Sequence, residues 1–295
     1  MFPNFGDMNA YFHICTEGLE RSLLFMDEDD YIFGMNLIPL CLQGEKSLKI
    51  VTFCLMSNHV HFIVRGDYEA SLRFIRGYKR LLSQRLGHRG RKDVFKNGGG
   101  VLIKEMDDPM YIVKAIAYVL RNPVKAGVNV TPQGYRWSPA RLYFSQNNED
   151  GSSCRHISDL SVTERKKLRS NYLSLPQDWL VDSKGMILPE NYVDVSMVES
   201  VYKKASQFMY YLCKQDDAMI ELDTGVLAKS SYNYEELAIN MKELLSRQYN
   251  VRSVSELGMQ SRIELASVMK RRYGATPAKL SRLVGIRKEL LEKLI

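Results

Sequence analysis

Residues 49–64, KIVTFCLMSNHVHFIV, decide the fold of this chain. Both halves of the stretch are rich in β-branched and aromatic residues, which favour extended backbone. Between them, Ser57 and Asn58 favour a turn. The stretch therefore predicts two strands, over residues 49–56 and 60–64, joined by a tight connection.

The segments on either side of this pair of strands continue the pattern. Residues 11–16 form a short β-prone run, and residues 27–42 carry apolar side chains at helical spacing. A basic helix is expected over residues 69–86, a strand over 101–105 and a further helix over 109–122. The order β-α-β-β-α-β followed by a helix predicts an α+β domain with a ferredoxin-like antiparallel sheet and helices on one face.

A polar segment, QNNEDGSS at residues 146–153, predicts a domain boundary. We therefore expect a first domain over residues 1–146 and a linker and mixed region without an assigned role over residues 147–230. Residues 231–295 are expected to form a mainly helical C-terminal domain.

Three short helices are expected at the end of the chain, over residues 261–274, 276–283 and 287–295. Gly274 is a plausible cap for the first of them, and Thr276 with Pro277 begins the second. The spacing predicts a helix-turn-helix module that binds DNA, while a small bundle for dimerisation or domain packing is the alternative. The module is basic, with Lys270, Arg271, Arg272, Arg282, Arg287 and Lys288.

Composition narrows the class of protein. In these 295 residues, 45% are hydrophobic and 25% are charged, which is typical of globular chains. The longest apolar stretch, residues 50–56, is far shorter than the ~20 residues that a membrane helix needs. No secretory signal is recognised at the N-terminus, so we expect a cytoplasmic protein. The formal net charge of +7 favours a polyanionic partner.

The cysteines do not indicate a disulfide framework or a zinc site. Their number is odd, they are widely spaced, and no C-x-x-C pair occurs. We expect them to be reduced and mostly buried as small hydrophobic residues. They are Cys15, Cys41, Cys54, Cys154 and Cys213.

A pair of histidines is the sharpest local feature. His59 and His61 are two residues apart in a predicted strand, so both imidazoles lie on one face while Val60 points to the other. Two adjacent imidazoles are a bidentate start for a divalent metal site. The alternative is a solvated pair on a half-exposed strand. We expect His13, on the first strand, to be structural or close to DNA rather than a ligand.

The helix ending near Asn122 offers further polar groups. Tyr118 and Asn122 are four residues apart and therefore share one helical face, which presents a phenol and an amide carbonyl together. Pro123 is expected to end this helix. The alternative is that Tyr118 is a core aromatic residue and Asn122 a polar residue at the helix terminus.

A long basic run follows the histidine strand. No acidic residue occurs over residues 71–92, which predicts contacts with a nucleic-acid backbone rather than an ordinary solvated face. Of its aromatic residues, Phe74 is expected in the core, and Tyr78 is a candidate for stacking on unpaired bases. The expected DNA-binding residues are Arg73, Arg76, Lys79, Arg80, Arg85, Arg89, Arg91 and Lys92.

Three stretches together resemble successive motifs of the single-tyrosine HUH transposases. They are MSNHVHFIV at residues 56–64, YVLRNPVKAG at 118–127 and YRWS at 135–138. This superfamily includes insertion-sequence transposases and REP-associated tyrosine transposase-like proteins. The resemblance covers roughly residues 8–144, and three motifs in order are more specific than any one. Ser57 departs from the pattern, because many relatives have proline there.

The resemblance implies a mechanism and a set of roles. His59 and His61 correspond to the metal-binding pair, Asn122 to a third polar ligand and Tyr118 to the nucleophile. The implied ion is Mg²⁺ or Mn²⁺, which polarises the scissile phosphate. Tyr118 then forms a 5′-phosphotyrosine intermediate and releases a 3′-hydroxyl, which allows strands to be cleaved and rejoined. The implied substrate is single-stranded or hairpin DNA associated with repeats, in DNA transposition, and a homodimer is possible.

Other functions fit parts of the same pattern. A non-catalytic, domesticated DNA-binding protein would keep the basic run, but the intact His59, His61, Tyr118 and Asn122 argue against decay. A related HUH endonuclease of the replication or relaxase type shares the histidine pair, although the Tyr-x-x-x-Asn-Pro spacing fits transposases better. An RNA-binding ferredoxin-like module lacks support, because no aromatic RNP-type strand is present.

Overall fold

The computed structural model describes most of the chain and divides it into two compact units. The described residues up to 122 and from 131 to 220 belong to the first unit, and the others belong to the second. The described residues are 10–16, 23–92, 94–95, 100–145, 154–168, 175–214, 220, 234–273 and 275–294.

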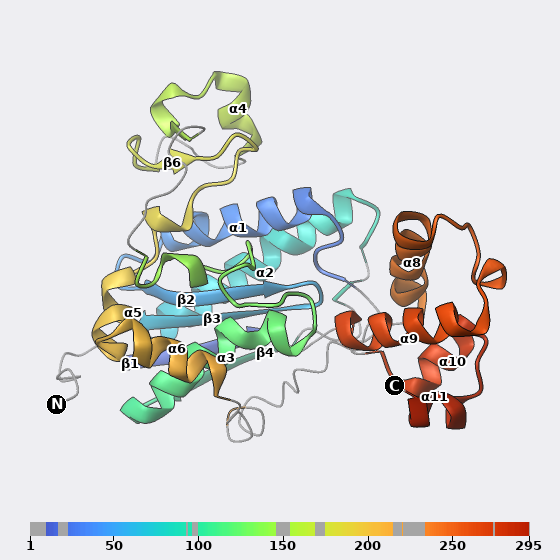
Figure 1. The fold of residues 1–295 in the computed structure, drawn as a ribbon. Helices are drawn as coiled ribbons and strands as arrows, with labels where there is room; N and C mark the ends of the chain where they lie inside the picture. The colour runs from blue at the N-terminus through green and yellow to red at the C-terminus, as the bar shows by residue number, and fades with distance from the viewer. Residues whose placement is uncertain are drawn as a thin grey trace. The chain divides into compact units, whose positions relative to one another are not determined.

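A four-stranded antiparallel sheet forms the centre of the first unit, and the expected α+β class is confirmed (Figure 1). Its strands are β1 (Ala10–Thr16), β2 (Lys49–Met56), β3 (His59–Gly66) and β4 (Val101–Met106). They lie in the order β2-β3-β1-β4, and each neighbouring pair is antiparallel. The strands predicted from residues 49–64 are therefore β2 and β3, and the turn between them is residues 57–58.

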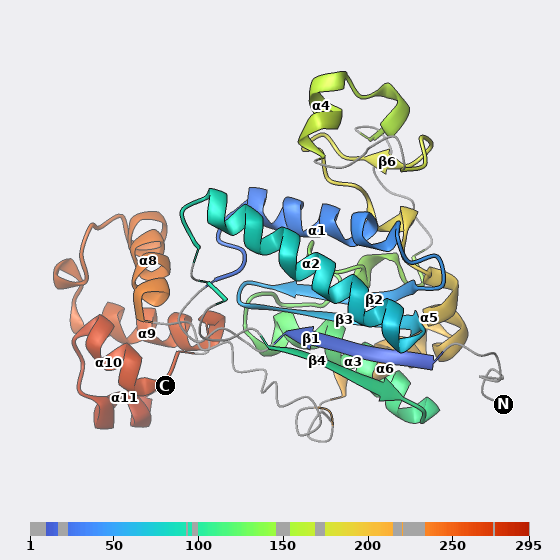
Figure 2. The same cartoon turned by 180° about the vertical axis from the view of Figure 1, so that it is seen from behind.

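Two helices cover one face of this sheet. Helix α1 (Glu28–Leu42) and helix α2 (Tyr68–His88) lie side by side there, as Figure 2 shows. From α2, Phe74 and Tyr78 pack edge-on against Phe62 of β3, with ring centroids 5.2 Å away in each case. Tyr78 is thus a core residue, and the expectation that it stacks on bases is wrong, because the i, i+4 spacing places it on the same buried face as Phe74.

A third helix packs on the opposite face. Helix α3 (Pro109–Lys125) brings Tyr118 against His61 of β3, with ring centroids 5.7 Å apart. His61 and Phe62 are adjacent in the strand, so their side chains point to opposite faces. The sheet therefore has helices on both faces, so the prediction of helices on one face is wrong, because the apolar side of α3 packs on the face opposite α1 and α2. The histidine pair lies on the face that α3 covers.

The prediction that Pro123 ends α3 is wrong, because the helix continues to Lys125. Proline lacks an amide hydrogen, but in the last turn this removes only one hydrogen bond. The chain leaves the helix at Gly127, whose φ of 66° is in the left-handed region that glycine adopts readily.

The described residues of the stretch expected to form a linker and mixed region belong to the first unit up to residue 220. Asn36 of α1 donates from Nδ2 to the Gly185 carbonyl at 2.8 Å and accepts from the Ile187 amide at 2.7 Å. Tyr202 donates to the Val113 carbonyl of α3 at 2.6 Å. The elements here are η1 (Ala140–Leu142), β5 (Arg155–His156), η3 (Ile157–Asp159), α4 (Val162–Lys167), β6 (Leu180–Val181), η5 (Pro189–Asn191), α5 (Val195–Tyr202) and α6 (Ala205–Cys213). The predicted boundary at residues 146–153 lies outside the described residues.

The C-terminal helices of the second unit have their own apolar core. Thr276 caps α10 by accepting from the Lys279 amide, Pro277 is its first residue, and Gly285 ends it with a φ of 69°. Leu265, Leu280 and Leu291 are fully buried between the helices. Gly274, the predicted cap of the preceding helix, lies outside the described residues. The elements are α8 (Tyr234–Leu244), η6 (Leu245–Tyr249), η7 (Val254–Glu256), α9 (Met259–Tyr273), α10 (Pro277–Val284) and α11 (Lys288–Leu294).

No helix within the described ranges has both the length and the apolar character needed to cross a membrane.

The two hydrogen bonds of Asn36 predict a measurable contribution to stability. Asn36→Ala removes both and leaves the Ile187 amide and the Gly185 carbonyl without their partner, so we expect the free energy of unfolding to fall by about 2–4 kcal/mol. Urea unfolding followed by circular dichroism measures the change. Asp29→Ala, at an exposed position of the same helix, is the control, with an expected loss below about 1 kcal/mol. Equal effects of the two substitutions would contradict this account of the packing.

Candidate functional site

The histidine pair is buried on the face of β3 that α3 covers. His59 and His61 lie next to each other, with ring centroids 4.8 Å apart and ring planes nearly perpendicular. His61 is fully buried and His59 almost so. The shared face predicted from the i, i+2 spacing is present, whereas a solvated pair on a half-exposed strand is not.

Helix α3 supplies the amide beside this pair. The Asn122 side chain donates from Nδ2 to the Tyr118 carbonyl at 3.0 Å, as expected one helical turn apart. This bond orients the amide, because the donor is used on the helix and Oδ1 is left to face elsewhere. The Asn122 amide lies close enough to both His59 and His61 to raise the pKa of each. The structure thus brings together the four side chains that the sequence selects.

The Nδ1 atom of each imidazole already lies within hydrogen-bond distance of a neighbouring side chain. His59 Nδ1 lies 2.8 Å from Asn58 Oδ1, and His61 Nδ1 lies 3.2 Å from His13 Nε2. An amide oxygen accepts hydrogen bonds and does not donate, so His59 Nδ1 carries the proton and His59 Nε2 keeps its lone pair. This is the tautomer that ligates a metal through Nε2.

Three buried atoms at the centre of the site have no hydrogen-bond partner among the described residues. They are His59 Nε2, His61 Nε2 and Asn122 Oδ1. A buried polar atom without a partner is costly, and such atoms are uncommon in folded proteins. Two imidazole nitrogens and one amide oxygen on the same side of the sheet fit a divalent cation that takes mixed nitrogen and oxygen ligands.

Burial keeps these histidines neutral. It lowers the pKa of His59 to about 4, although the Asn122 amide opposes the shift. The pKa of His61 is held well below its usual value, first by burial and then by the neighbouring His59 and His13. Burial and then the charge of Lys104 lower the pKa of His13 to about 4. Neutral imidazoles offer lone pairs, so the site is ready to ligate a metal at neutral pH.

Tyr118 is also fully buried, edge-on against both His13 and His61. Tyr111, the second tyrosine of α3, is nearly buried and lies under the ammonium of Lys104, 5.1 Å from its ring centroid. Neither phenol is open to solvent in this conformation. Because Tyr118 is fully buried, the residues packed around it must move before a phosphate can contact its phenol.

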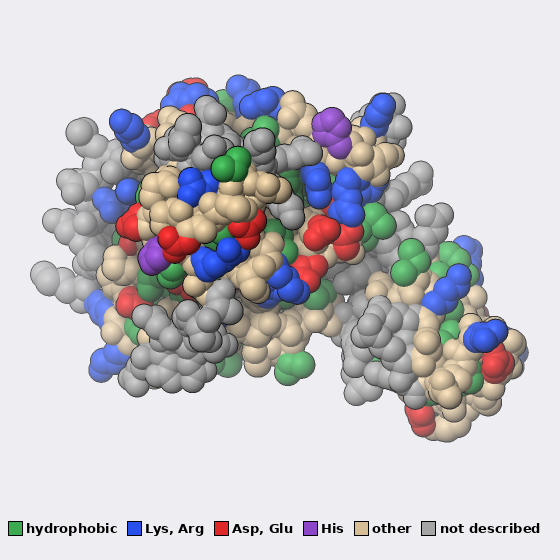
Figure 3. All heavy atoms as spheres, turned by 90° about the horizontal axis from the view of Figure 1, so that it is seen from above, with side chains coloured by type: hydrophobic (Ala, Val, Ile, Leu, Met, Phe, Trp, Pro, Cys, Tyr) green, Lys and Arg blue, Asp and Glu red, His purple; other side chains and the backbone are tan. Residues whose placement is uncertain are grey.

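Several residues of the expected DNA-binding run are held by acidic groups. Arg73 makes a bidentate pair with Glu45, at 2.8 and 2.9 Å. Arg89 binds Asp27 and Asp30, and Arg91 also binds the buried Asp30. The partners come from α1 and its flanking turns, which is why the run itself contains no acid. On the face seen from above, basic and acidic side chains are interspersed (Figure 3).

Other members of the run line a groove of about 540 Å³ beside the edge strand β4. Arg76 and Arg80 are exposed there and form no ion pair with a described residue. Lys79 lies over the Phe95 ring at 5.0 Å, and Tyr68, half-exposed, lines the same groove. Arg85 instead lies over Phe33 of α1, at 5.2 Å, and Lys92 is exposed.

The third motif fastens the chain beside the end of β2. Tyr135 donates to the Leu55 carbonyl at 2.7 Å, and the Leu55 amide donates to the Trp137 carbonyl at 3.0 Å. Trp137 stacks on Tyr31 of α1 with ring centroids 4.6 Å apart. These contacts fasten the third motif to β2 and α1.

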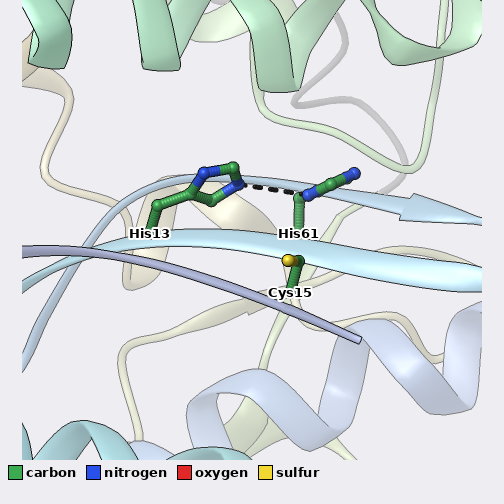
Figure 4. Close-up of side chains that lie close together, drawn as sticks. All are labelled: His13, Cys15 and His61. Atoms are coloured by element: carbon green, nitrogen blue, oxygen red, sulfur yellow. Dashed lines mark hydrogen bonds between the residues drawn. The ribbon is translucent and has the colours of Figure 1, made fainter. Parts of the chain in front are cut away.

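Two further groups were not assigned to the site from the sequence. His13 contacts His61 directly, and Cys15, two residues later on β1, lies opposite His61 in the strand register. One ligating atom from each of the three residues lies within 4.8 Å of the others (Figure 4). The signal was present in the sequence, because His13-x-Cys15 has the same spacing in a strand as His59-x-His61.

Comparison with known proteins adds little. No model of a known protein family matches the chain, and no curated protein matches it. The chain is similar to a solved structure of a REP-associated tyrosine transposase bound to a REP hairpin. The two share 18% sequence identity and a TM-score of 0.36, over 45% of this chain and 77% of that chain. Similarity at this level does not establish a shared function. The residues of the chain itself must therefore indicate its function.

The buried histidines predict that the protein loses stability in mild acid. The unfolded chain takes up protons near pH 6.5, whereas His13 and His59 in the folded state do so only near pH 4. Stability is therefore complete above about pH 6.5 and falls toward pH 4, by about 1.4 kcal/mol per pH unit for each such group.

Urea unfolding at several pH values between these limits measures the slope. His59→Gln is expected to make the slope shallower, and His88→Gln, at an exposed position, is expected to leave it unchanged. The same slope in wild type and His59→Gln would show that His59 is not neutral in the folded state.

Proposed function

We propose that this chain is a metal-dependent DNA-cleaving and rejoining enzyme of the single-tyrosine HUH type. The observation that carries the proposal is that His59 Nε2, His61 Nε2 and Asn122 Oδ1 are all buried and lack a hydrogen-bond partner within the described part of the chain, beside Tyr118, which lies on the same helix as Asn122. In this proposal residues 1–146 form an HUH nuclease domain with ferredoxin-like topology, and the chain acts in DNA transposition.

His59, His61 and Asn122 would hold the ion, with water and phosphate oxygens completing its shell. A bound Mg²⁺ or Mn²⁺ supplies a Lewis acid that neutralises developing charge on the phosphate. Asn58 keeps His59 in the ligating tautomer. The Asn122 bond to the Tyr118 carbonyl keeps the ligand and the nucleophile in fixed relation on α3.

In the proposed reaction, the Tyr118 phenol loses its proton and its oxygen attacks the scissile phosphorus. The bond from phosphorus to the 3′-oxygen breaks and that oxygen takes up a proton, which leaves a 5′-phosphotyrosine and a free 3′-hydroxyl with no net change in protons. Attack of a 3′-hydroxyl on the phosphotyrosine then rejoins the strands and releases Tyr118. The phosphoester is exchanged and never hydrolysed, so no external energy source is needed.

The groove beside β4 is the best-supported surface for the DNA strand. Arg76 and Arg80 are available for phosphates, and the rings of Tyr68 and Phe95 line the same groove as candidates for base stacking. Arg73, Arg89 and Arg91 are less suitable, because each is already paired with a carboxylate. The C-terminal helices α9 to α11 are a second proposed DNA-binding surface, as a helix-turn-helix.

Full burial of Tyr118 favours one alternative, a DNA-binding protein that no longer cleaves. Such a protein would keep the basic groove and use the histidine cluster only for packing. The same experiment separates the two functions, because only the enzyme forms a covalent adduct.

The nucleophile assignment predicts the behaviour of two tyrosine variants. Wild type is expected to form a covalent adduct with single-stranded hairpin DNA labelled at its 3′ end, in Mn²⁺ or Mg²⁺, measured by denaturing gel, because the 5′-phosphotyrosine link retains the fragment on the 3′ side of the cut. Tyr118→Phe is expected to lose the adduct completely, and His59→Ala to lose it or need far more metal. Tyr111→Phe, on the same helix, is the control and should retain it. DNA binding without any adduct in wild type would favour the non-catalytic alternative.

The groove assignment predicts which arginines matter for affinity. The double variant Arg76→Gln, Arg80→Gln should bind single-stranded DNA more weakly. It should also reduce the slope of log affinity against log salt by about 0.7 for each phosphate that the protein no longer neutralises. Fluorescence anisotropy at several salt concentrations measures both effects. Arg73→Gln is the control, because its guanidinium is held by Glu45. A larger effect of Arg73→Gln than of the double variant would exclude this groove.

A further inference from the structure

The side of His61 away from Asn122 faces a second set of ligating groups. His13 Nε2 lies 3.2 Å from His61 Nδ1, and Cys15 is the cross-strand partner of His61 in the β1–β3 pair. All three side chains are fully buried, and one ligating atom from each lies within 4.8 Å of the others (Figure 4). The proposed DNA cleavage uses only His61 of these three residues, so it gives no role to His13 and Cys15.

We propose that His13, Cys15 and His61 form a second metal site, selective for a thiophilic ion such as Zn²⁺, and that its occupation switches off the first site. A thiolate with two imidazoles is a soft donor set, which suits zinc and not Mg²⁺. The proposal has two parts, the existence of the zinc site and its antagonism with the His59, His61 and Asn122 site. Only the second part rests on the proposed function.

The spacing of the two imidazoles suits a zinc ion. Two nitrogens at zinc–nitrogen distances near 2.0–2.1 Å in a tetrahedron lie about 3.3–3.4 Å apart. The observed separation of His13 Nε2 and His61 Nδ1 is 3.2 Å, so either a shared proton or a metal ion fits between these atoms. A tetrahedral sulfur and nitrogen lie about 3.5 Å apart, so a small side-chain movement of Cys15 suffices to complete the set. Three protein ligands leave the fourth position to water.

Antagonism follows from the single lone pair of a neutral imidazole. When His61 Nδ1 carries the proton and donates it to His13 Nε2, His61 Nε2 is left as a ligand for the first site. When zinc binds His61 Nδ1, the proton moves to Nε2, which then cannot ligate. His61 therefore serves one site or the other, as long as it stays neutral.

The binding step balances with the release of one proton. Cys15 loses its thiol proton to solvent and binds as a thiolate, while the His61 proton moves from Nδ1 to Nε2. His13 keeps its proton on Nδ1 and binds through Nε2. No oxidant or reductant takes part, because zinc does not change its oxidation state.

Cobalt tests the site without relying on enzyme activity. Co²⁺ is added to metal-free full-length protein, and absorption is recorded until it is constant. We expect intense visible bands of a tetrahedral ion and a near-ultraviolet band of thiolate-to-cobalt charge transfer, both removed by equimolar Zn²⁺. Cys15→Ser should lose the thiolate band. Cys54→Ser is the matched control, because Cys54 is also fully buried and also lies opposite His61, on β2.

Absence of the thiolate band from wild type, or its persistence in Cys15→Ser, would overturn the proposal. If Cys15→Ser does not fold by circular dichroism, His13→Gln replaces it. Its expected result is Co²⁺ affinity reduced by more than about tenfold, and unchanged affinity would again overturn the site.

A second measurement tests the antagonism. Mn²⁺ binding to the first site is followed by electron paramagnetic resonance, with and without one equivalent of Zn²⁺. Zinc should weaken Mn²⁺ binding by more than about tenfold in wild type and have little effect in Cys15→Ser. Undiminished Mn²⁺ binding in the zinc-loaded protein would refute the antagonism. Failure of Mn²⁺ to bind in the absence of zinc would instead count against the proposed function, and the cobalt result would stand separately.

Discussion

The buried, neutral imidazole pair on β3 is the constraint on which the rest of the site depends. Burying two titratable rings is favourable only if they stay neutral and their polar atoms find partners. Asn58 and His13 engage one nitrogen of each ring, which leaves the two Nε2 atoms and Asn122 Oδ1 buried without a hydrogen-bond partner among the described residues. The unsatisfied atoms are thus a consequence of how their neighbours are arranged, and a metal ion is the partner that we propose for them.

The position of β3 in the sheet explains why so many groups meet at His61. β3 lies between β2 and β1, so His61 has a cysteine opposite it on each side, Cys54 and Cys15. Helix α3 covers this face with Tyr118, while α1 and α2 cover the other with aromatic side chains. A single residue of the sheet, His61, is therefore in contact with both neighbouring strands and with Tyr118 of α3, the proposed nucleophile.

Tertiary contacts reduce the number of unpaired basic side chains on and just after helix α2. Its sequence lacks acids over a long run, which indicates a nucleic-acid surface. In the folded chain, Asp27, Asp30 and Glu45 neutralise part of that run from another element. What remains exposed is a shorter basic strip beside β4, with aromatic side chains in the same groove. The positive charge available to DNA is thus smaller and more localised than the sequence suggests.

Local periodicity was enough to predict the hairpin of β2 and β3, the common face of His59 and His61, and the one-turn relation of Tyr118 to Asn122. These features depend only on residues a few positions apart, because strand and helix geometry repeats every two or 3.6 residues. Tertiary structure alone decided that Tyr118 is buried, that His13 engages His61, that Cys15 lies opposite it and that residues 154–168 and 175–213 belong to the first unit. His13 and His61 are 48 residues apart, and no local rule pairs them. The sequence by itself therefore determined which chemical groups are present and how each is spaced along its own strand or helix. Which nitrogen is left to bind a metal was decided only by packing between distant segments.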